Sequence, residues 1–274
     1  MLSVDQAREK AEALVEQATR AGADGADALY LGEYSSGVQV RKGALEDVHR
    51  SESEGLGLRV FRGTRSASVS SSDLSPNALS ILVERALAMA AEAPEDPYAG
   101  LAPAELLARP PFADLDSWDP VEPDPAVLKA RALQAEGAAL AVKGVTNSSG
   151  AGASASASTV AMAISTGFSG GYRATGHSCS ASVVAGSGSG MERDFAWHSA
   201  RFAADLEDAA TIGRRAGERA VARLNPVKVA GGTMPVLFDP RVATTLLGHF
   251  VSAISGSAVA RKSSFLMDRL GQAV

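Results

Sequence analysis

Residues 145–203 constrain the fold most, because they are rich in Ser, Ala and Gly and still keep a strand-like pattern. Such a composition alone is typical of a flexible linker. However, Val160, Met162 and Ile164 alternate with smaller residues, and residues two apart in a strand share a face. We therefore expect long antiparallel strands whose small side chains let a helix approach closely.

Two helices are expected to flank these strands. One covers residues 205–224 and the other runs from Asp124-Pro125, a cap followed by a first-turn proline, to about Val142. Small residues recur along one side of each, as tight packing requires. The proposed stripes are Leu206, Ala209, Gly213, Gly217, Ala220 and Leu224 in the first, and Ala126, Ala130, Leu133, Gly137 and Leu140 in the second.

The N-terminal part alternates helix, strands and helix. Helical spacing covers residues 3–22 and 75–92, and short apolar alternations between 26 and 71 indicate a meander with a hairpin around Ser35-Ser36-Gly37. A strand is also expected at 234–238. These patterns predict an α+β protein that begins with a two-layer helix and antiparallel-sheet domain.

Prolines and acidic residues concentrate between residues 93 and 123, which predicts an extended connector. The expected organisation is an N-terminal α+β domain at 1–95, a connector at 96–123, a middle α+β domain at 124–225, and the incomplete start of a C-terminal domain at 226–274.

Charge and cysteine content exclude several classes of protein. The 274 residues carry a net charge of −5 and one cysteine, Cys179. We expect no nucleic-acid surface, no disulfide, no cysteine-based zinc cluster and no membrane span, and a cytoplasmic location is the default.

A helix after Asp239-Pro240 resembles a zinc-protease helix without its ligands. Such a helix needs a His followed by Glu, and a second His about a turn later. Here His249 is followed by Phe250. A single imidazole cannot make this site, so we expect no metal bound by this chain.

Three other features suggest chemistry. Gly167-Phe168-Ser169-Gly170-Gly171 matches the nucleophile elbow of serine hydrolases, which would need His177 or His198 near Ser169. His177 and Cys179 share a strand face, but a buried apolar cysteine is the simpler interpretation. Basic residues on the first sheet, including Arg41 and Arg59, lie near acidic ones in the sequence. Cross-strand pairing on an exposed face is the ordinary explanation, and a substrate- or partner-binding face is the alternative.

The order of segments resembles the TldD/PmbA family, once called modulators of DNA gyrase. Three segments carry the resemblance: Val38-Gln39-Val40-Arg41-Lys42-Gly43 with Glu54-Gly55-Leu56-Gly57-Leu58-Arg59-Val60-Phe61, then Val145-Thr146-Asn147-Ser148-Ser149-Gly150, then Pro235-Val236-Leu237-Phe238-Asp239-Pro240 with Arg261-Lys262-Ser263-Ser264-Phe265. The resemblance spans essentially the whole sequence.

The family contains chains with a His-Glu-x-x-x-His zinc motif, which are TldD-like, and chains without it, which are PmbA- or TldE-like. The motif falls on Gly248, His249 and Ala253, none of which matches. The resemblance therefore implies a non-catalytic subunit that pairs with a TldD-like, zinc-bearing chain to degrade or trim unfolded peptides and peptide precursors.

The resemblance also implies that a β-rich C-terminal domain continues past the end of this sequence. Candidate contacts to peptide or partner are Arg41, Arg59, Arg261 and Lys262. The alternatives left open are a serine hydrolase using Ser169 and a non-enzymatic regulatory protein of a DNA-related target, although the acidic balance argues against direct DNA contact.

Overall fold

The computed structural model describes residues 1–273, and the chain divides into two compact units, Met1–Pro226 and Val227–Val274. Helices and an antiparallel sheet confirm the predicted α+β class. The domain boundaries expected from the sequence remain predictions.

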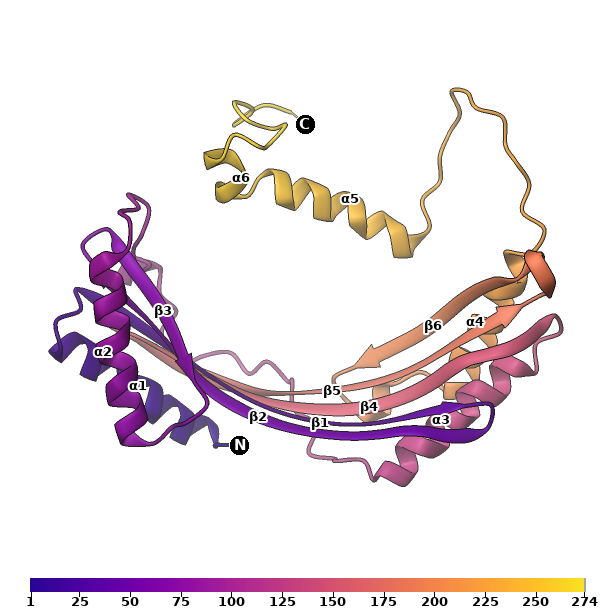
Figure 1. The fold of residues 1–274 in the computed structure, drawn as a ribbon, viewed down its shortest axis with the longest axis horizontal. Coiled ribbons are helices and arrows are strands. Elements are labelled where there is room, and N and C mark those ends of the chain that lie inside the picture. The colour runs from indigo at the N-terminus through magenta and orange to yellow at the C-terminus, as the bar shows by residue number, and fades with distance from the viewer. Residues whose placement is uncertain (274) are drawn as a thin grey trace. The chain divides into compact units, whose positions relative to one another are not determined.

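One six-stranded sheet forms the first unit (Figure 1). Its order is β3-β2-β1-β4-β5-β6, and every neighbouring pair is antiparallel. The strands are β1 (Gly25–Arg41), β2 (Ala44–Arg62), β3 (Arg65–Ser71), β4 (Val145–Ile164), β5 (Phe168–Ala185) and β6 (Glu192–Ala200). The long strands expected in the Ser- and Gly-rich region are therefore present.

Two meanders of three strands join through β1 and β4. These strands pair from Asp27 opposite Ile164 to Val40 opposite Ala151. The meander of residues 25–71 and the strands of residues 145–200 consequently share one continuous sheet, although the chain runs through the connector between them.

Helices cover one face of this sheet at both ends (Figure 1). The helices are α1 (Val4–Arg20), α2 (Pro76–Glu92), α3 (Pro125–Leu140) and α4 (Ala209–Ala222), and short 3-10 turns lie at Ala104–Leu106, Gly188–Gly190 and Ala203–Asp205. Each helix begins at a capping side chain: Ser3, Ser75, Asp124 and Asp208.

From Ala151 onward, the odd-numbered residues of β4 face the helix layers. Ala161 and Ala163 belong to the core under α1 and α2, and Ala151 and Ala153 belong to the core under α3 and α4. Because alternate residues in a strand share a face, the two cores lie on the same side of the sheet. The stretch of that face between them is left for the connector.

The hairpin expected at Ser35–Gly37 is wrong. β1 continues through these residues because they pair with β2 on one side and β4 on the other, so their backbone groups are satisfied without a turn. The turn lies at Lys42 and Gly43, whose φ angles of 55° and 76° suit a two-residue hairpin.

The prediction of which face is buried in the helix after Asp124 is also wrong. α3 instead buries Leu128, Ala132, Ala135, Glu136 and Ala139. The contact with α4 selects this face, since a Cβ atom added to Gly213 would lie 1.9 Å from the Ala135 carbonyl oxygen. The small residues therefore permit close helix-to-helix contact.

The second unit contains helices α5 (Pro240–Ala253) and α6 (Gly256–Ala260). The strand prediction for 234–238 is wrong, because these residues are irregular, Leu237 is fully exposed, and no strand within residues 1–273 pairs with their backbone. Within this unit the apolar side of α5 is exposed at Leu246, Phe250 and Ile254.

Candidate functional site

A pocket of about 290 Å³ lies on the helix-covered face of the first unit. Its floor includes Ala155 and Ala157 of β4, which lie between the alanines of the two cores. Connector residues 118–123 form another wall. The connector thus closes the part of the face that the helices leave open.

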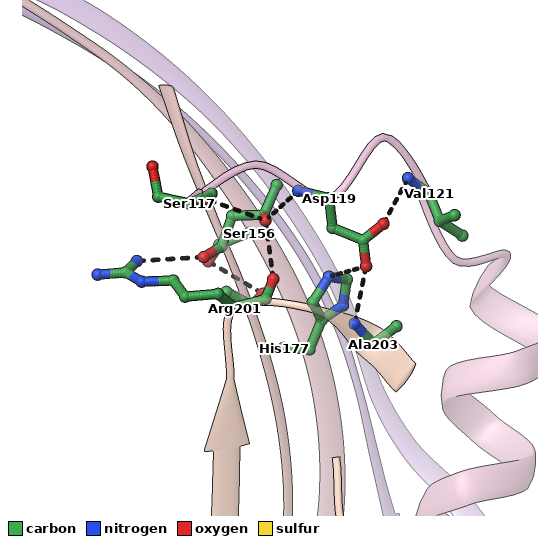
Figure 2. A network of polar contacts seen from close by, with 9 residues as sticks. Ser117, Asp119, Val121, Ser156, His177, Arg201 and Ala203 are labelled. Atoms are coloured by element: carbon green, nitrogen blue, oxygen red, sulfur yellow. Dashed lines mark hydrogen bonds and ion pairs between the residues drawn. The ribbon is translucent and has the colours of Figure 1, made fainter. Parts of the chain in front are cut away.

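Asp119 and His177 form a buried polar pair in the wall of this pocket (Figure 2). One Asp119 oxygen accepts hydrogen bonds from the backbone of Ala203 at 2.7 Å, and the other accepts from that of Val121 at 2.9 Å. His177 Nε2 lies 3.3 Å from Asp119 Oδ2 but off the line that a hydrogen bond needs. The two side chains are therefore in close polar contact without a well-aligned hydrogen bond.

Thr175 completes the attachment of the connector to β5. Its hydroxyl accepts from the Asp119 N–H at 2.9 Å and donates to the Arg201 carbonyl at 2.8 Å, and its own N–H donates to the Ser117 carbonyl at 2.9 Å. This hydroxyl is already occupied, and no hydroxyl or thiol of the described residues hydrogen-bonds to His177. The Asp119–His177 pair therefore does not activate a nucleophile. Its role is to hold the connector, β5 and residues 201–203 together.

Both partners have lowered pKa values. Burial lowers the pKa of His177, assisted by the charge of Arg131 and opposed by Asp119. Hydrogen bonds from the Ala203 and Val121 amides, in that order, lower the pKa of Asp119. The pair is consequently a neutral imidazole beside a carboxylate at neutral pH.

Acid should therefore destabilise the first unit through His177. The unfolded chain takes up a proton near pH 6.5, the ordinary value, whereas the folded chain resists protonation to lower pH. Stability should fall as pH drops below about 6.5, and a second loss from Asp119 should begin below its ordinary value of 3.8. Urea unfolding at pH 7.5 and 5.5 measures the first loss, which should shrink in His177→Gln.

The control is His49→Gln, a change at an exposed imidazole of the same sheet. It should leave the difference between the two pH values close to that of the unmodified protein. An undiminished loss in His177→Gln would show that other groups cause the acid sensitivity.

Sequence reasoning did not find the Asp119–His177 pair. Asp119 is one of several acidic residues in the connector, and the sequence pattern connects His177 only with Cys179 and Ser169. One sequence feature could have indicated the pair: His177 shares the inward face of its strand with Cys179. A buried imidazole needs a polar partner, so this position predicts one.

The structure contradicts the serine-hydrolase alternative. Ser169 lies in β5 rather than at a strand-to-helix turn, and its hydroxyl donates to the Glu12 carboxylate. His177 is eight residues further along the same strand, which is about 26 Å. His198 pairs with Cys179, further still.

Cys179 is an interior residue, as the simpler interpretation held. It is fully buried, and burial raises the pKa of its thiol to about 11. A thiol that stays protonated at neutral pH is a poor nucleophile.

The three degenerate zinc-motif positions lie on α5. Gly248 and His249 are exposed, and Ala253 is buried, with its carbonyl accepting from the Ser264 hydroxyl at 2.7 Å. One imidazole without a neighbouring carboxylate does not fit a zinc ion, which takes four ligands. Among residues 1–273, no three His, Cys, Asp or Glu side chains gather as a metal site would require.

The structure does not bring the candidate contact residues Arg41 and Arg59 together. Arg59 pairs with Asp27 at 2.6 Å across β1 and β2, and Arg41 pairs with Glu46 near the other end of the hairpin. Both ion pairs follow the cross-strand pairing considered for this sheet. Arg261 and Lys262 follow α6 in the second unit. Their roles in binding stay predictions.

Among the described residues, no helix combines the length and the apolar content that crossing a bilayer requires.

Sequence profiles of one family match in three places. The matched segments are the "PmbA/TldA metallopeptidase domain 1" over residues 26–90, the "central domain" over 118–224 and the "C-terminal domain" over 231–274. The profiles therefore follow one another along most of the chain.

Named relatives agree with these profiles. "Metalloprotease PmbA" of Escherichia coli O157:H7 is 38% identical over 252 residues, which are 92% of this chain and 56% of that protein. The "Metalloprotease PmbA homolog" of Haemophilus influenzae is 35% identical over 95% of this chain and 57% of its own length. The chain thus spans about half the length of these relatives.

Solved structures share the fold. A Bacteroides thetaiotaomicron protein, described as a candidate modulator of DNA gyrase, matches 99% of this chain and 62% of its own with a TM-score of 0.91 at 23% identity. TldE of Thermococcus kodakarensis matches 94% of this chain and 58% of its own with a TM-score of 0.69 at 15% identity. Likeness at these identities concerns the fold alone.

Proposed function

Because this chain belongs to the PmbA/TldD family, we propose that it is a PmbA/TldE-like subunit of a heterodimeric zinc metalloprotease, with no catalytic centre of its own. The partner is a TldD-like chain that holds the zinc ion. The pair acts in the cytoplasm and degrades or trims unfolded peptides and peptide precursors.

The side chains of α5 carry this proposal. The resemblance places the family's zinc motif on Gly248, His249 and Ala253, which together offer one imidazole and no carboxylate. A protease zinc ion needs three protein ligands and a base that activates water. The relatives named "Metalloprotease PmbA" support a role in peptide hydrolysis. Because this helix lacks the zinc ligands for that role, we assign them to a zinc-bearing partner chain.

Zinc content and peptide cleavage test the proposal directly. The purified chain alone should contain no stoichiometric zinc and should not cleave an unfolded peptide. After co-purification with a TldD-like chain, the complex should contain zinc and cleave the peptide, and a chelator should abolish cleavage. Metal analysis by mass spectrometry and peptide analysis by chromatography provide the two measurements.

A matched substitution separates this chain from its partner. His249→Ala removes the remaining imidazole of the degenerate motif, and it should leave both zinc content and cleavage by the complex unchanged. Stoichiometric zinc in the lone chain, or zinc loss from the complex with His249→Ala, would refute the assignment.

A further inference from the structure

The pocket beside Asp119 contains two arginines whose charges have no carboxylate partner. Arg50 lies over the ring of Tyr34, with its Cζ atom 4.9 Å from the ring centroid, and Arg173 lies over Trp118 at 3.3 Å. Both side chains line the pocket, and neither belongs to an ion pair of the described residues.

Neither guanidinium group donates a hydrogen bond to another described residue, so the donors of both are available. A guanidinium group contacts an aromatic ring through its flat face, whereas its five N–H donors lie in its own plane. These donors match the spacing of carboxylate and phosphate oxygens. Tyr34 and Trp118 therefore orient the two cations without consuming their hydrogen-bonding capacity.

Two of the three acidic side chains that line the pocket are already engaged, Glu52 and Asp119. Glu52 lies 3.1 Å from the Met1 amine, whereas the nearby Glu122 raises the pKa of Tyr34. Asp119 is occupied by two backbone amides and by His177. The lining thus has two arginines without a carboxylate partner, and Glu122 is its one carboxylate without a cation or a backbone partner among the described residues.

The rest of the lining is mostly apolar. Ala155, Ala157, Pro120, Val121 and the ring of Trp118 face the same space of about 290 Å³. A site that combines apolar walls with a few oriented donors is typical of small-molecule binding.

From this geometry we propose that the pocket formed by β1, β2, β4, β5 and connector residues 118–123 binds a small molecule bearing a carboxylate or phosphate group. Arg50 and Arg173 bind the anionic oxygens, and the apolar walls contact the body of the ligand. The site consists of residues from Met1–Pro226 alone, so it is independent of the proposed protease role.

An NMR titration of the full chain tests this site. Amide and indole signals are followed with inorganic phosphate, phenyl phosphate and benzoate, each against sodium chloride at equal ionic strength. We expect saturable shifts of the Trp118 indole and of residues 118–123 with at least one probe. A response to the phosphates alone assigns phosphate, and a response to benzoate alone assigns carboxylate.

Charge-matched variants provide the decisive comparison. Arg50→Gln with Arg173→Gln should weaken binding at least about tenfold, because charge-assisted hydrogen bonds are lost. Arg62→Gln with Arg193→Gln removes the same charge from exposed arginines outside this pocket and should leave binding unchanged. If the double variant does not fold, Arg50→Gln and Arg173→Gln are tested separately, and each should bind the anion measurably more weakly than the unmodified protein.

The site is absent if no probe gives saturable shifts beyond those of chloride. It is also absent if both double variants weaken binding equally, since that result would indicate attraction by overall charge alone.

Discussion

Replacing Gly213 by Ala should lower the free energy of unfolding of the first unit by about 2–3 kcal/mol. An added Cβ atom would lie 1.9 Å from the Ala135 carbonyl oxygen and 2.8 Å from its carbonyl carbon. These are backbone atoms of α3, so no side chain can move aside. The helices α3 and α4 must separate instead, which opens gaps throughout their shared core.

The same substitution at Gly137 is the matched control. Gly137 is an exposed glycine within α3, and an added Cβ would meet no atom within 4 Å. Alanine there should raise the free energy of unfolding by about 0.5–1 kcal/mol, because it favours the helical backbone. If the free energy of unfolding falls in Gly213→Ala and rises in Gly137→Ala, the close contact between α3 and α4 is the cause of the loss.

Thermal and urea unfolding followed by circular dichroism measure both variants. A loss of 2–3 kcal/mol corresponds to a fall in Tm of about 5–10 °C for a unit of this size. If Gly213→Ala were as stable as the unmodified protein, the helices could not lie as close as the structure places them.

The local elements were predictable because local residues determine them. Ser3 with Gln6 forms the expected capping box at the start of α1, and Asp124 caps α3 just before Pro125. Alternation also identified the long strands of residues 145–203 despite their linker-like composition. These features depend on interactions between residues only a few positions apart.

The shared sheet was not predictable, because it depends on distant pairing. Nothing near Asp27 in the sequence shows that it lies opposite Ile164. The same pairing turned the expected turn at Ser35–Gly37 into continuous strand. Turn propensity is weaker than a full set of hydrogen bonds to both neighbours.

The buried side of α3 was missed for a related reason. This helix has small or apolar residues on several sides, so spacing alone does not single out one face. The side that is buried includes a charged residue, Glu136, which a search for apolar stripes discards. The Asp119–His177 pair was also not predictable, because Asp119 and His177 are 58 positions apart in the sequence.

Glu136 is a buried carboxylate that joins α3 to two segments of the sheet. It is 2% exposed, and its carboxylate accepts from the backbone N–H groups of Lys42 and Gly43, each at 2.7 Å. The Ser148 hydroxyl donates to the same carboxylate. One side chain of α3 thus holds both the β1–β2 turn and the start of β4.

Glu136→Gln should lower the free energy of unfolding by about 2–4 kcal/mol, since it removes charge-assisted hydrogen bonds and leaves a buried donor unsatisfied. Glutamine has nearly the same shape, but its NH₂ group would face a backbone N–H, and two donors cannot bond. Glu218→Gln, at an exposed residue of α4, is the control and should change stability by less than about 0.5 kcal/mol.

Hydrogen exchange locates the loss. In Glu136→Gln the amides of Lys42 and Gly43, and those of the adjoining ends of β1 and β2, should exchange faster than in the unmodified protein, because their acceptor is gone. The amides of β3, at the far edge of the sheet, should change only as much as global stability does. Unchanged protection at the turn would mean that Glu136 does not hold it, and that the contact between α3 and the hairpin depends on apolar packing alone.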